Sequence, residues 1–317
     1  MYTVGSLFAG IGGICTGFKE AGFEPLWANE LDKHACMTFR ANLGHRMHEG
    51  DITEIRDPMT SMGSVDILTS GFPCQAFSIA GGQLGFKDPR GNMFMETARF
   101  IHNLQPQAFM LENVKNLVNH DKGRTMEVIE SELRGLGYSF EYFVLNSFEY
   151  GNIPQNRERV YIVGFKDEEY ANAFEKPKPI PLTRTIHDCV KHDWYEQKYY
   201  YDGTKYYPML LEAMENQDTV YQLRRIYVRE NKNNLCPTLT ANMGTGGHNV
   251  PLIRDKYGIR KLLPFECLNF QGFPCWFHFP ENMANCHCYK QAGNSVTVPV
   301  ITRVAKAMMQ ALDVRKD

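Results

Sequence analysis

Residues 8–13, FAGIGG, stand between a short apolar run at residues 2–8 and a segment with helical spacing that extends to Ala21. Glycines at a strand-to-helix turn let the backbone approach a ligand closely, as they do in nucleotide-binding folds. A tight turn without a ligand would use glycine in the same way. The stretch therefore predicts an α/β fold that begins with a strand, and it leaves open whether the turn binds a ligand.

Strand and helix patterns alternate over the first 165 residues. Further short apolar runs, typical of buried parallel strands, lie at residues 23–28, 65–69, 108–111 and 160–165. Segments with helical spacing lie between them at residues 31–42, 93–104 and 125–136. This alternation predicts a parallel sheet with helices on both faces, a doubly wound α/β domain that binds ligands at the carboxyl ends of its strands.

The pattern changes at residues 176–181, KPKPIP, where alternating prolines favour an extended linker. From there to about residue 258 the sequence is rich in Tyr, Asn and Lys, and it lacks the strand–helix alternation. Residues 296–312 are again amphipathic and helical. We therefore expect one α/β domain, an inserted or appended small domain, and a C-terminal helix that returns to the first domain.

Composition excludes several classes of protein. The chain has 317 residues, a length that fits two domains, and 34 Lys and Arg against 36 Asp and Glu give a net charge of -2. It has no run of about 20 apolar residues, and no basic segment precedes an apolar one at its start, so we expect neither a membrane span nor secretion. A near-neutral charge also excludes binding of polyanions by bulk charge alone.

The nine cysteines do not form the pattern of a disulfide framework. Their number is odd and the chain is long, which fits a reducing cytoplasm. Cys275, His278 and residues 286–288 (Cys-His-Cys) could gather around a metal ion, but CxxH followed by CHC lacks the usual separation of two to four residues in the second pair. We therefore expect no metal site.

The segment 71–78, GFPCQAFS, follows the apolar run at 65–69, so Cys74 is expected at the carboxyl end of a strand. A cysteine ahead of a loop and a helix can become a thiolate nucleophile, because nearby backbone N–H groups lower its pKa. A buried structural cysteine is the competing interpretation and the better one for the other eight. Glu112 at a second strand end and the segment 155–159, QNRER, bring a carboxyl group and guanidinium groups to the same edge, as covalent catalysis requires.

Two further carboxylates stand at strand ends. Glu30 ends the second predicted strand, where it can accept hydrogen bonds from ribose hydroxyls, and Asp51 follows the third strand region, where an adenine amino group is a suitable partner. Helix capping is the more common role of such residues and remains the alternative for both.

Together these segments resemble the ordered motifs of the DNA (cytosine-5)-methyltransferases. The motifs are FAGIGG, NELD (29–32), GDI (50–52), GFPCQAFS, ENV (112–114), QNRER, RKLLPFECLNFQGFP (260–274) and QAGNS (291–295). The likeness covers residues 1 to about 165 and 260–317, and it is closest to the compact bacterial modification enzymes of restriction systems. Ser6 stands where many relatives have Asp, and Asn152 is an additional residue; neither departure removes a catalytic side chain.

The resemblance implies a Rossmann-like, S-adenosylmethionine-dependent methyltransferase fold of the α/β class with a smaller target-recognition domain. Residues 1–178, completed by 290–317, would form the catalytic and cofactor-binding domain, and residues 179–289 the target-recognition domain and hinge. It implies double-stranded DNA as substrate, with a cognate restriction endonuclease that acts on the same site as a further partner. We expect a monomer in the cytoplasm, associated with the nucleoid when bound to DNA and without membrane contact.

The resemblance also implies roles for individual residues. The Cys74 thiolate would add to C6 of cytosine, Glu112 would donate to N3 and Arg159 would hold O2, with Arg157 and Asn113 in support. Because C6 is inaccessible in a stacked duplex, the target base must flip out of the helix. The matching S-adenosylmethionine positions are Phe8, Gly10, Gly12, Glu30, Leu31, Asp51, Ile52, Pro73, Asn294 and Ser295.

DNA contacts are expected from two regions. The loop at residues 75–92 resembles a lid over the flipped base, with Gln75, Ser78 and Arg90 as contacts, while Gln222, Arg225 and Thr238 would contact DNA from the middle segment. A basic cleft could be lined by Arg90, Lys122, Arg157, Arg224, Arg225 and Arg229. A solvated charged surface is the competing interpretation for each residue of the middle segment.

Three alternatives remain. A tRNA cytosine-5 methyltransferase would use the same scaffold, but its relatives carry a Cys-Phe-Thr signature that the middle region lacks. A catalytically silent DNA-binding module would not need Cys74, Glu112 and Arg159 intact. A nicotinamide dehydrogenase would leave GFPCQ and ENV without a role.

Overall fold

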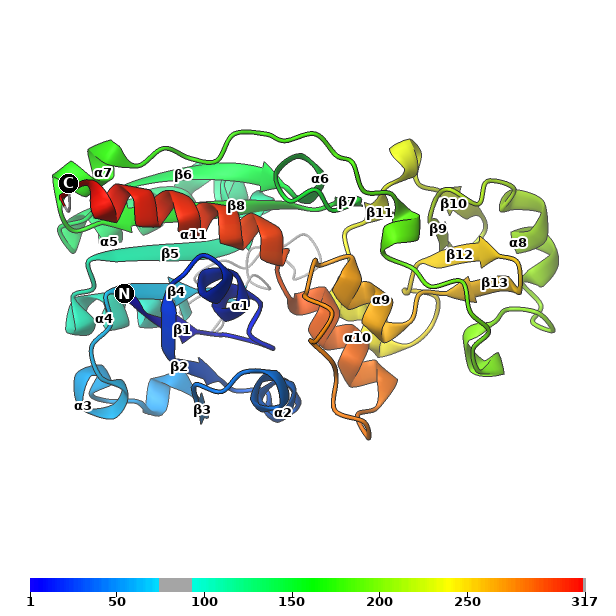
Figure 1. Ribbon diagram of the computed structural model, residues 1–317, viewed down its shortest axis with the longest axis horizontal. Coiled ribbons are helices and arrows are strands. Elements are labelled where there is room, and N and C mark those ends of the chain that lie inside the picture. Colours follow the sequence, from blue (N-terminus) through cyan, green and yellow to red (C-terminus); the bar gives the residue numbers. More distant parts are fainter. Residues whose placement is uncertain (74–92, 316–317) are drawn as a thin grey trace. The chain divides into compact units, whose positions relative to one another are not determined.

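The computed structural model describes residues 1–73 and 93–315 (Figure 1). The chain divides into two compact units. The first unit comprises Met1–Leu145, Glu158–Lys178 and Val300–Asp317, and the second comprises Asn146–Arg157 and Pro179–Pro299.

The first unit is built around a sheet that has seven strands within the described residues, in the order β3-β2-β1-β4-β5-β8-β6. The strands are β1 (Thr3–Leu7), β2 (Glu24–Glu30), β3 (Arg46–Glu49), β4 (Ile67–Ser70), β5 (Ala108–Val114), β6 (Ser139–Asn146) and β8 (Glu158–Phe165). The pairs β1–β2, β1–β4, β2–β3 and β4–β5 are parallel. The predicted α/β class and the five predicted strands are confirmed.

The sheet is not parallel throughout, and that part of the prediction is wrong. β8 pairs with β5 in the antiparallel direction, with Ala108 opposite Phe165 and Val114 opposite Arg159. β6, which the sequence did not indicate, lies beside β8 at the edge. Only residues 147–157 connect β6 to β8, whereas a parallel crossover needs about a dozen residues or more, usually with a helix.

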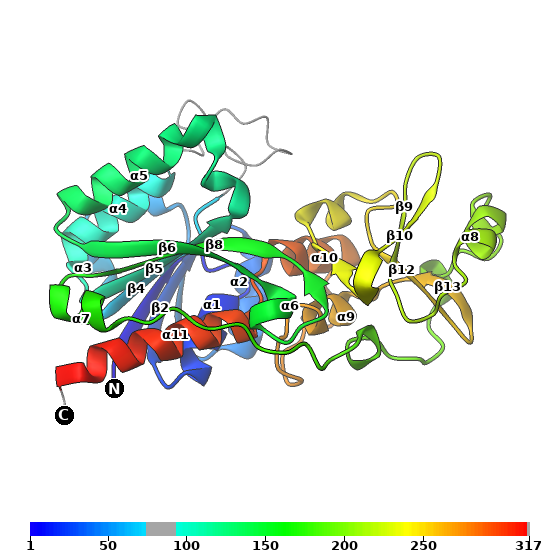
Figure 2. The same cartoon turned by 90° about the horizontal axis from the view of Figure 1, so that it is seen from above.

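Helices cover both faces of this sheet, as expected. α4 (Met93–Leu104) and α5 (Arg124–Gly135) lie on one face, while α1 (Gly13–Glu20) and α11 (Val298–Leu312) lie on the other (Figure 2). α4 is amphipathic because its apolar residues recur with helical spacing, and its buried residues include Phe94, Ala98 and Ile101. The remaining helices of this unit are α2 (Lys33–Asn42), α3 (Pro58–Met62), α7 (Glu168–Ala173), and the 3-10 turns η1 (Ile52–Glu54), η5 (Lys115–Leu117), η6 (His120–Gly123) and η11 (Asp313–Arg315).

The last helix returns to the first unit, as the sequence predicted. The Tyr2 hydroxyl donates a hydrogen bond to the carbonyl of Leu312 at 2.8 Å, so both chain ends lie in the first unit (Figure 1). α11 packs closely on α1, because a Cβ atom at Gly17 would lie 2.6 Å from Cγ2 of Ile301. The glycine therefore sets how close the two helices can approach.

Ser6, the residue that departs from the family pattern, has a local partner. Its hydroxyl lies 2.5 Å from the hydroxyl of Thr69 on the neighbouring strand β4, and both side chains are buried. The two hydroxyls satisfy one another inside the sheet, so the pair avoids the cost of a buried polar group without a hydrogen bond.

The second unit contains an antiparallel sheet in the order β10-β9-β12-β13. Its strands are β9 (Tyr221–Leu223), β10 (Val228–Glu230), β12 (Leu252–Asp255) and β13 (Gly258–Lys261), and a separate parallel pair joins β7 (Gln155–Asn156) to β11 (Cys236–Pro237). Its helices are α6 (Ser147–Tyr150), α8 (Tyr207–Ala213), α9 (Pro264–Asn269) and α10 (Asn285–Asn294), with the 3-10 turns η7 (Ile186–Asp188), η8 (Gln197–Tyr199), η9 (Lys232–Asn234) and η10 (Ala241–Thr245).

A buried charge cluster holds the second unit together. The Arg260 guanidinium donates two 2.8 Å hydrogen bonds to the Glu266 carboxylate and one of 3.1 Å to Asp255. The Arg260 and Glu266 side chains are fully buried, and the carboxylate also accepts from the backbone N–H groups of Lys191 and Leu263. The cluster thus connects the β12–β13 hairpin, α9 and residue 191.

A boundary between the two units lies between Lys178 and Pro179, within residues 174–185, which have no helix or strand. Residues 146–157 and 290–299 belong to the second compact unit. α10 packs against η10 so closely that a Cβ atom at Gly293 would lie 2.1 Å from the carbonyl carbon of Thr240. The assignment of the units to catalysis and target recognition stays a prediction.

Candidate active site

Polar side chains of the first unit gather at one edge of its sheet. β1, β2, β4 and β5 are parallel, so their carboxyl ends share this edge. β8 runs in the opposite direction, so its amino end, with Arg159, lies at the same edge as the carboxyl end of β5. The reversal that the sequence did not predict is therefore what brings Arg159 beside the ENV segment.

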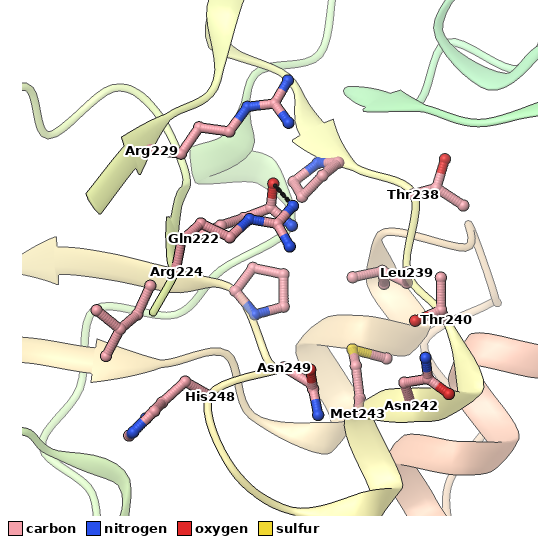
Figure 3. Close-up of a pocket in the computed structure, with 13 residues that line it drawn as sticks. Gln222, Arg224, Arg229, Thr238, Leu239, Thr240, Asn242, Met243, His248 and Asn249 are labelled. Carbon is pink, nitrogen blue, oxygen red and sulfur yellow. Dashed lines mark hydrogen bonds between the residues drawn. The ribbon is translucent and has the colours of Figure 1, made fainter. Parts of the chain in front are cut away.

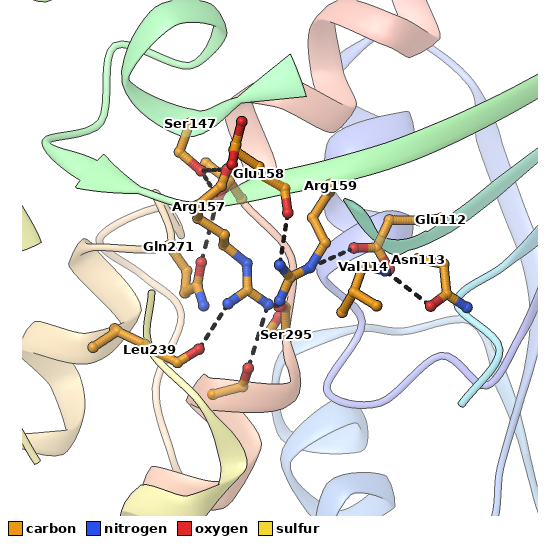
Figure 4. Close-up of polar contacts among 12 residues, drawn as sticks. Glu112, Asn113, Val114, Ser147, Arg157, Glu158, Arg159, Leu239, Gln271 and Ser295 are labelled. Atoms are coloured by element: carbon orange, nitrogen blue, oxygen red, sulfur yellow. Dashed lines mark hydrogen bonds and ion pairs between the residues drawn. The ribbon is translucent and has the colours of Figure 1, made fainter. Parts of the chain in front are cut away.

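Glu112 and Arg159 form an ion pair at this edge (Figure 4). In the β5–β8 register Arg159 stands opposite Val114, two residues from Glu112, and residues two apart on a strand project from the same face. Nε of Arg159 lies 3.1 Å from Oε1 of Glu112, and the side chains are 15% and 11% exposed. A nearly buried pair that keeps some solvent access can reach a ligand at the sheet edge.

Asn113 fixes the backbone ahead of the predicted nucleophile. Its amide nitrogen donates to the carbonyl of Phe72 at 3.0 Å, and its amide oxygen accepts from the N–H of Val114 at 2.8 Å. Phe72 is itself buried against Phe94. Pro73 follows and is half-buried, whereas the predicted residues Cys74, Gln75, Ser78 and Arg90 lie outside the described residues.

The other cysteines of the first unit do not suit a nucleophile. Burial raises the pKa of the Cys15 thiol to about 11. Burial, reinforced by the nearby Glu30 carboxylate, raises the pKa of the Cys36 thiol to about 12. Both groups therefore stay protonated at neutral pH, and a thiol is a far weaker nucleophile than a thiolate.

The glycine-rich turn adopts left-handed backbone conformations. Phe8, Gly10 and Gly12 have φ values of 52°, 56° and 92°. A Cβ atom at Gly12 would lie 2.3 Å from Cδ1 of Leu43, so this glycine is required by packing. At Gly10, apart from the glycine and its two neighbours in the chain, no atom of residues 1–73 or 93–315 lies within 4 Å of the same position, so the backbone is open to a ligand there.

Glu30 ties the end of β2 to this turn. Its Oε2 accepts from the N–H of Gly10 at 2.8 Å, and its Oε1 accepts from the N–H groups of Leu31 at 2.9 Å and Asp32 at 2.8 Å. A carboxylate has about four lone-pair sites, so three hydrogen bonds still leave capacity for one hydroxyl group. The predicted contact with a ribose therefore remains compatible with the structure.

The remaining predicted cofactor residues of the first unit lie at the same strand ends. Oδ1 of Asp51 caps η1 by accepting from the N–H of Thr53 at 2.9 Å, as the capping alternative proposed. Ile52 is buried, and Leu31 has an exposed side chain. Asn294 and Ser295 lie in the second unit, at the end of α10.

Arg157 differs from its neighbour Arg159 in both burial and partners. It is only 3% exposed, and its guanidinium donates to the backbone carbonyls of Leu239 at 2.7 Å, Gly293 at 3.3 Å and Ser295 (Figure 4). The expectation that Arg157 lines a basic cleft is therefore wrong, because its buried guanidinium donates hydrogen bonds to backbone carbonyl groups inside the second unit.

A pocket of about 330 Å³ lies within the second unit. Gln222 of β9 and Arg229 of β10 project from one side of it, and Thr238 lies on the other side (Figure 3). Arg229 and Gln222 are cross-strand partners, which explains why both reach the same space. Sequence reasoning named Gln222 and Thr238 but not Asn242 and Asn249, since single asparagines in a 3-10 turn and a loop carry no local signal.

Arg225 does not line this pocket. It stands in the turn between β9 and β10, where its neighbours Ile226 and Tyr227 are 86% and 53% exposed. The N–H of Arg224 closes the turn on the carbonyl of Tyr227 at 2.9 Å. The turn thus presents positive charge and apolar surface together.

The described residues provide no site for a metal ion and no membrane-spanning helix. No group of three or more His, Cys, Asp or Glu side chains in residues 1–73 and 93–315 is arranged to hold a metal. In the same ranges, every helix is too short or too polar to cross a bilayer.

Comparison with known proteins decides the family. A family model described as C-5 cytosine-specific DNA methylase matches residues 2–310. The chain belongs to this family. The Type II methyltransferase M.Bsp6I of Bacillus sp. (strain RFL6) is 51% identical over 317 residues, which cover 98% of this chain and all of that protein. The Type II methyltransferase M.DsaV of Dactylococcopsis salina is 37% identical, over 97% of this chain and 86% of that protein.

Solved structures agree on the methylase fold. The methyltransferase EhMeth of Entamoeba histolytica superposes with a TM-score of 0.77 at 14% identity, over 98% of this chain and 99% of that one. A DNMT2 mutant of Spodoptera frugiperda superposes with a TM-score of 0.74 at 19% identity, over 98% of this chain and 100% of that one.

Family membership identifies the chain as a DNA (cytosine-5)-methyltransferase with a Rossmann-like methyltransferase fold. The dehydrogenase and the silent binding module are set aside, and the tRNA methyltransferase is less supported.

Proposed function

We propose that this methylase modifies a specific site in duplex DNA by flipping the target cytosine out and attacking it with Cys74. The observation that carries the proposal is the Glu112–Arg159 pair, 3.1 Å apart at the sheet edge, with Asn113 hydrogen-bonded to the backbone of Phe72, two residues before Cys74. A carboxyl group and a guanidinium at one place suit the N3 and O2 edge of a flipped base.

The reaction balances with these residues. The Cys74 sulfur forms a bond to C6 while Glu112 donates to N3 and Arg159 holds O2, which moves an electron pair to C5. C5 takes a methyl group from a sulfonium, whose sulfur keeps the bonding pair. A base removes the C5 proton, and the C5–H electron pair forms the C5=C6 double bond as the thiolate leaves. The proton on N3 returns to Glu112. Cys74 is thereby regenerated, and one methyl replaces one proton.

The methyl donor in this proposal is S-adenosylmethionine, which supplies an electrophilic methyl group on a sulfonium. The first unit fits it at the turn of residues 8–13, where Gly10 leaves its backbone open and Glu30 keeps acceptor capacity for a hydroxyl. Asp51, Ile52, Leu31 and Pro73 are proposed as further contacts from this unit. Asn294 and Ser295 would contribute from the second.

Sequence reading is assigned to the second unit. Gln222 and Arg229 line the same pocket as Thr238, and amide and guanidinium groups can form paired hydrogen bonds with adenine and guanine edges. The Thr238 hydroxyl donates to the carbonyl of Asn156, so it is suited to accept a hydrogen bond from a base amino group. Arg225 on the exposed β9–β10 turn is suited to a phosphate. Gln75, Ser78 and Arg90 are proposed as contacts of the loop at residues 75–92.

A covalent trap tests the mechanism. Enzyme mixed with S-adenosylmethionine and DNA whose target base is 5-fluorocytosine should give a protein–DNA adduct that survives denaturation, because fluorine cannot leave as a proton does. Cys74→Ser should form no adduct and lose most methyl transfer while it still binds DNA. Cys286→Ser, at an exposed cysteine of the second unit, is the matched control and should form the adduct normally. An active enzyme without an adduct would overturn the covalent step.

Bisulfite sequencing of a host genome that expresses the gene tests the substrate and the site together. We expect complete protection of one short sequence and little protection elsewhere. Modification of tRNA with an unmethylated genome would reverse the conclusion in favour of the RNA substrate.

We further propose a monomer that acts in the cytoplasm on chromosomal DNA and protects it from a restriction endonuclease of the same specificity. DNA methylated by the enzyme should then resist cleavage by endonucleases that recognise the mapped site. Light scattering of the enzyme should give the mass of one 36.4 kDa chain.

A further inference from the structure

The QNRER segment is divided at the boundary between the two units. Gln155, Asn156 and Arg157 belong to the second unit, and Glu158 and Arg159 belong to the first. In the second unit, β7 pairs in parallel with β11, with Gln155 opposite Cys236 and Asn156 opposite Pro237. The motif therefore has a structural role in the second unit that is separate from the ion pair of Arg159.

Three successive residues of this segment hold the chain just after β11. The Thr238 hydroxyl donates to the carbonyl of Asn156 at 2.6 Å. The peptide groups of Leu239 are fixed on both sides, because its N–H donates to Oε1 of Gln155 at 3.0 Å and its carbonyl accepts from Arg157 at 2.7 Å. Gln155 is fully buried, so these hydrogen bonds are shielded from water.

The same guanidinium reaches the end of α10. Its Nη2 donates to the carbonyls of Gly293 and Ser295, while Nη1 holds Leu239. The planar guanidinium presents its donors in a fixed fork, so a shift at one acceptor changes the geometry at the others. The two backbones also touch directly, since a Cβ atom at Gly293 would lie 2.1 Å from Thr240.

We propose that Arg157 is a positioning residue that couples target recognition to cofactor binding within the second unit. Thr238, adjacent to Leu239, is assigned to DNA contact, and Asn294 and Ser295 are assigned to the cofactor, so the inference rests on the proposed function. When cognate DNA binds and moves residues 238–239, the Arg157 guanidinium shifts with them. This shift changes the position of the Ser295 carbonyl, to which the same guanidinium donates. Coupling of this kind is reciprocal: the cofactor must favour cognate DNA by the same factor.

The test measures S-adenosylmethionine binding by calorimetry, with the wild-type enzyme alone, with its mapped duplex site and with an unrelated duplex. We expect the cognate duplex to tighten cofactor binding by at least about fivefold, the lower end of usual coupling. Arg157→Lys keeps the positive charge but cannot donate to Leu239, Gly293 and Ser295 at once as the planar guanidinium does. The factor by which cognate DNA tightens cofactor binding should therefore fall towards one. Equal factors for wild type and variant, or a wild-type factor of one, would overturn the inference.

Two further variants separate coupling from damage to the fold. Arg254→Lys is the matched control, because Arg254 of the same unit donates to the carbonyl of Met214 at 2.8 Å, outside both segments, and its coupling should be normal. Gln155→Met removes the acceptor for Leu239 and leaves the Arg157–Ser295 contact in place. We expect it to bind the cofactor normally without DNA and to lose the coupling; normal coupling would count against the proposal.

The covalent trap distinguishes this inference from the proposed function. If wild-type enzyme forms the 5-fluorocytosine adduct and the coupling factor does not depend on Arg157, only the inference fails. If no adduct forms, the proposed function itself fails.

Discussion

The Glu112–Arg159 pair and the Arg260 cluster contain the same chemical groups in opposite settings. The Arg260, Asp255 and Glu266 side chains are fully buried, and the arginine has acceptors from several segments around it. Glu112 and Arg159 are 11% and 15% exposed and meet at the edge of a sheet. The cluster of the second unit is closed and holds its fold, whereas the pair of the first unit remains accessible to a substrate.

The difference has a physical basis. Bringing charges out of water costs several kcal/mol per ion, and only excellent geometry with further hydrogen bonds repays it. Arg260 meets that condition through the two oxygens of Glu266, whose carboxylate also accepts two backbone N–H groups. A pair at an edge can exchange its mutual contact for contacts with a bound base.

The largest expected effect is on catalysis. Glu112→Gln removes the acid that we propose donates to N3, so we expect kcat to fall by about 10²–10⁴-fold, the usual contribution of a general acid. The melting temperature should change little, because glutamine keeps the shape and a hydrogen-bonding oxygen. Glu158→Gln is the control, since Glu158 forms only a surface pair with Lys115 at 2.8 Å and should retain full activity. A large loss of stability in Glu112→Gln would show that the pair is structural after all.

Arg260→Met should affect stability first. Removing one partner of a buried ion pair leaves uncompensated carboxylates, so we expect a loss of about 3–5 kcal/mol in the free energy of unfolding. Urea denaturation monitored by circular dichroism measures it. Arg124→Met, at the exposed pair with Asp121, should leave the free energy of unfolding nearly unchanged. If the two variants lost the same free energy of unfolding, the buried cluster would not be more important for stability than an exposed ion pair.

Acid should weaken the first unit through His45. Burial lowers the pKa of His45 to about 4 from 6.5, so the unfolded chain binds the extra proton between these values and the folded chain does not. Stability is therefore complete above about pH 6.5 and falls as the pH drops towards 4, by about 2 kcal/mol after allowance for partial exposure of the ring. Urea denaturation at pH 7.5 and 4.5 should show this loss in wild type and a smaller one in His45→Phe. Equal losses would exclude His45 as the cause.

Substitutions at two glycines, one in each unit, should differ in whether they affect ligand binding or stability. Gly10→Ala should cost about 1 kcal/mol of stability because of its left-handed φ of 56°, with weaker cofactor binding as the main result. Gly293→Ala forces a Cβ against the Thr240 backbone and should cost up to about 3 kcal/mol. Thermal unfolding and cofactor titration measure both. An unaffected cofactor affinity in Gly10→Ala would argue against the ligand at this turn.

Much of the first unit could be predicted from local pattern. The apolar runs located β1, β2, β4, β5 and β8, and helical spacing located α4 at its observed bounds, residues 93–104. β6 was missed because its exposed and buried residues do not alternate regularly: Ser139, Glu141 and Tyr142 are exposed. The direction of β8 was also missed, since periodicity identifies a strand but not its neighbour.

The sequence predicted the site only where a residue's role follows from the strand or turn in which it stands. Gly10 and Glu30 stand at strand ends that the sequence indicated, and the structure joins them by a hydrogen bond. Arg157 shows the limit, because its acceptors at Leu239 and Ser295 are 82 and 138 residues away in the sequence. No local pattern encodes such contacts, so an arginine taken for a support of catalysis was found among backbone carbonyls.

The division of the QNRER segment determines which pieces of this enzyme can be exchanged with a relative to alter its specificity. A chimera that replaced residues 179–299 alone would leave Gln155 and Arg157 of one parent to hold the peptide that corresponds to Leu239 of the other. The transferable module has two parts, residues 146–157 together with 179–299. A recombination experiment that respects these junctions moves the proposed recognition surface together with the residues that support it.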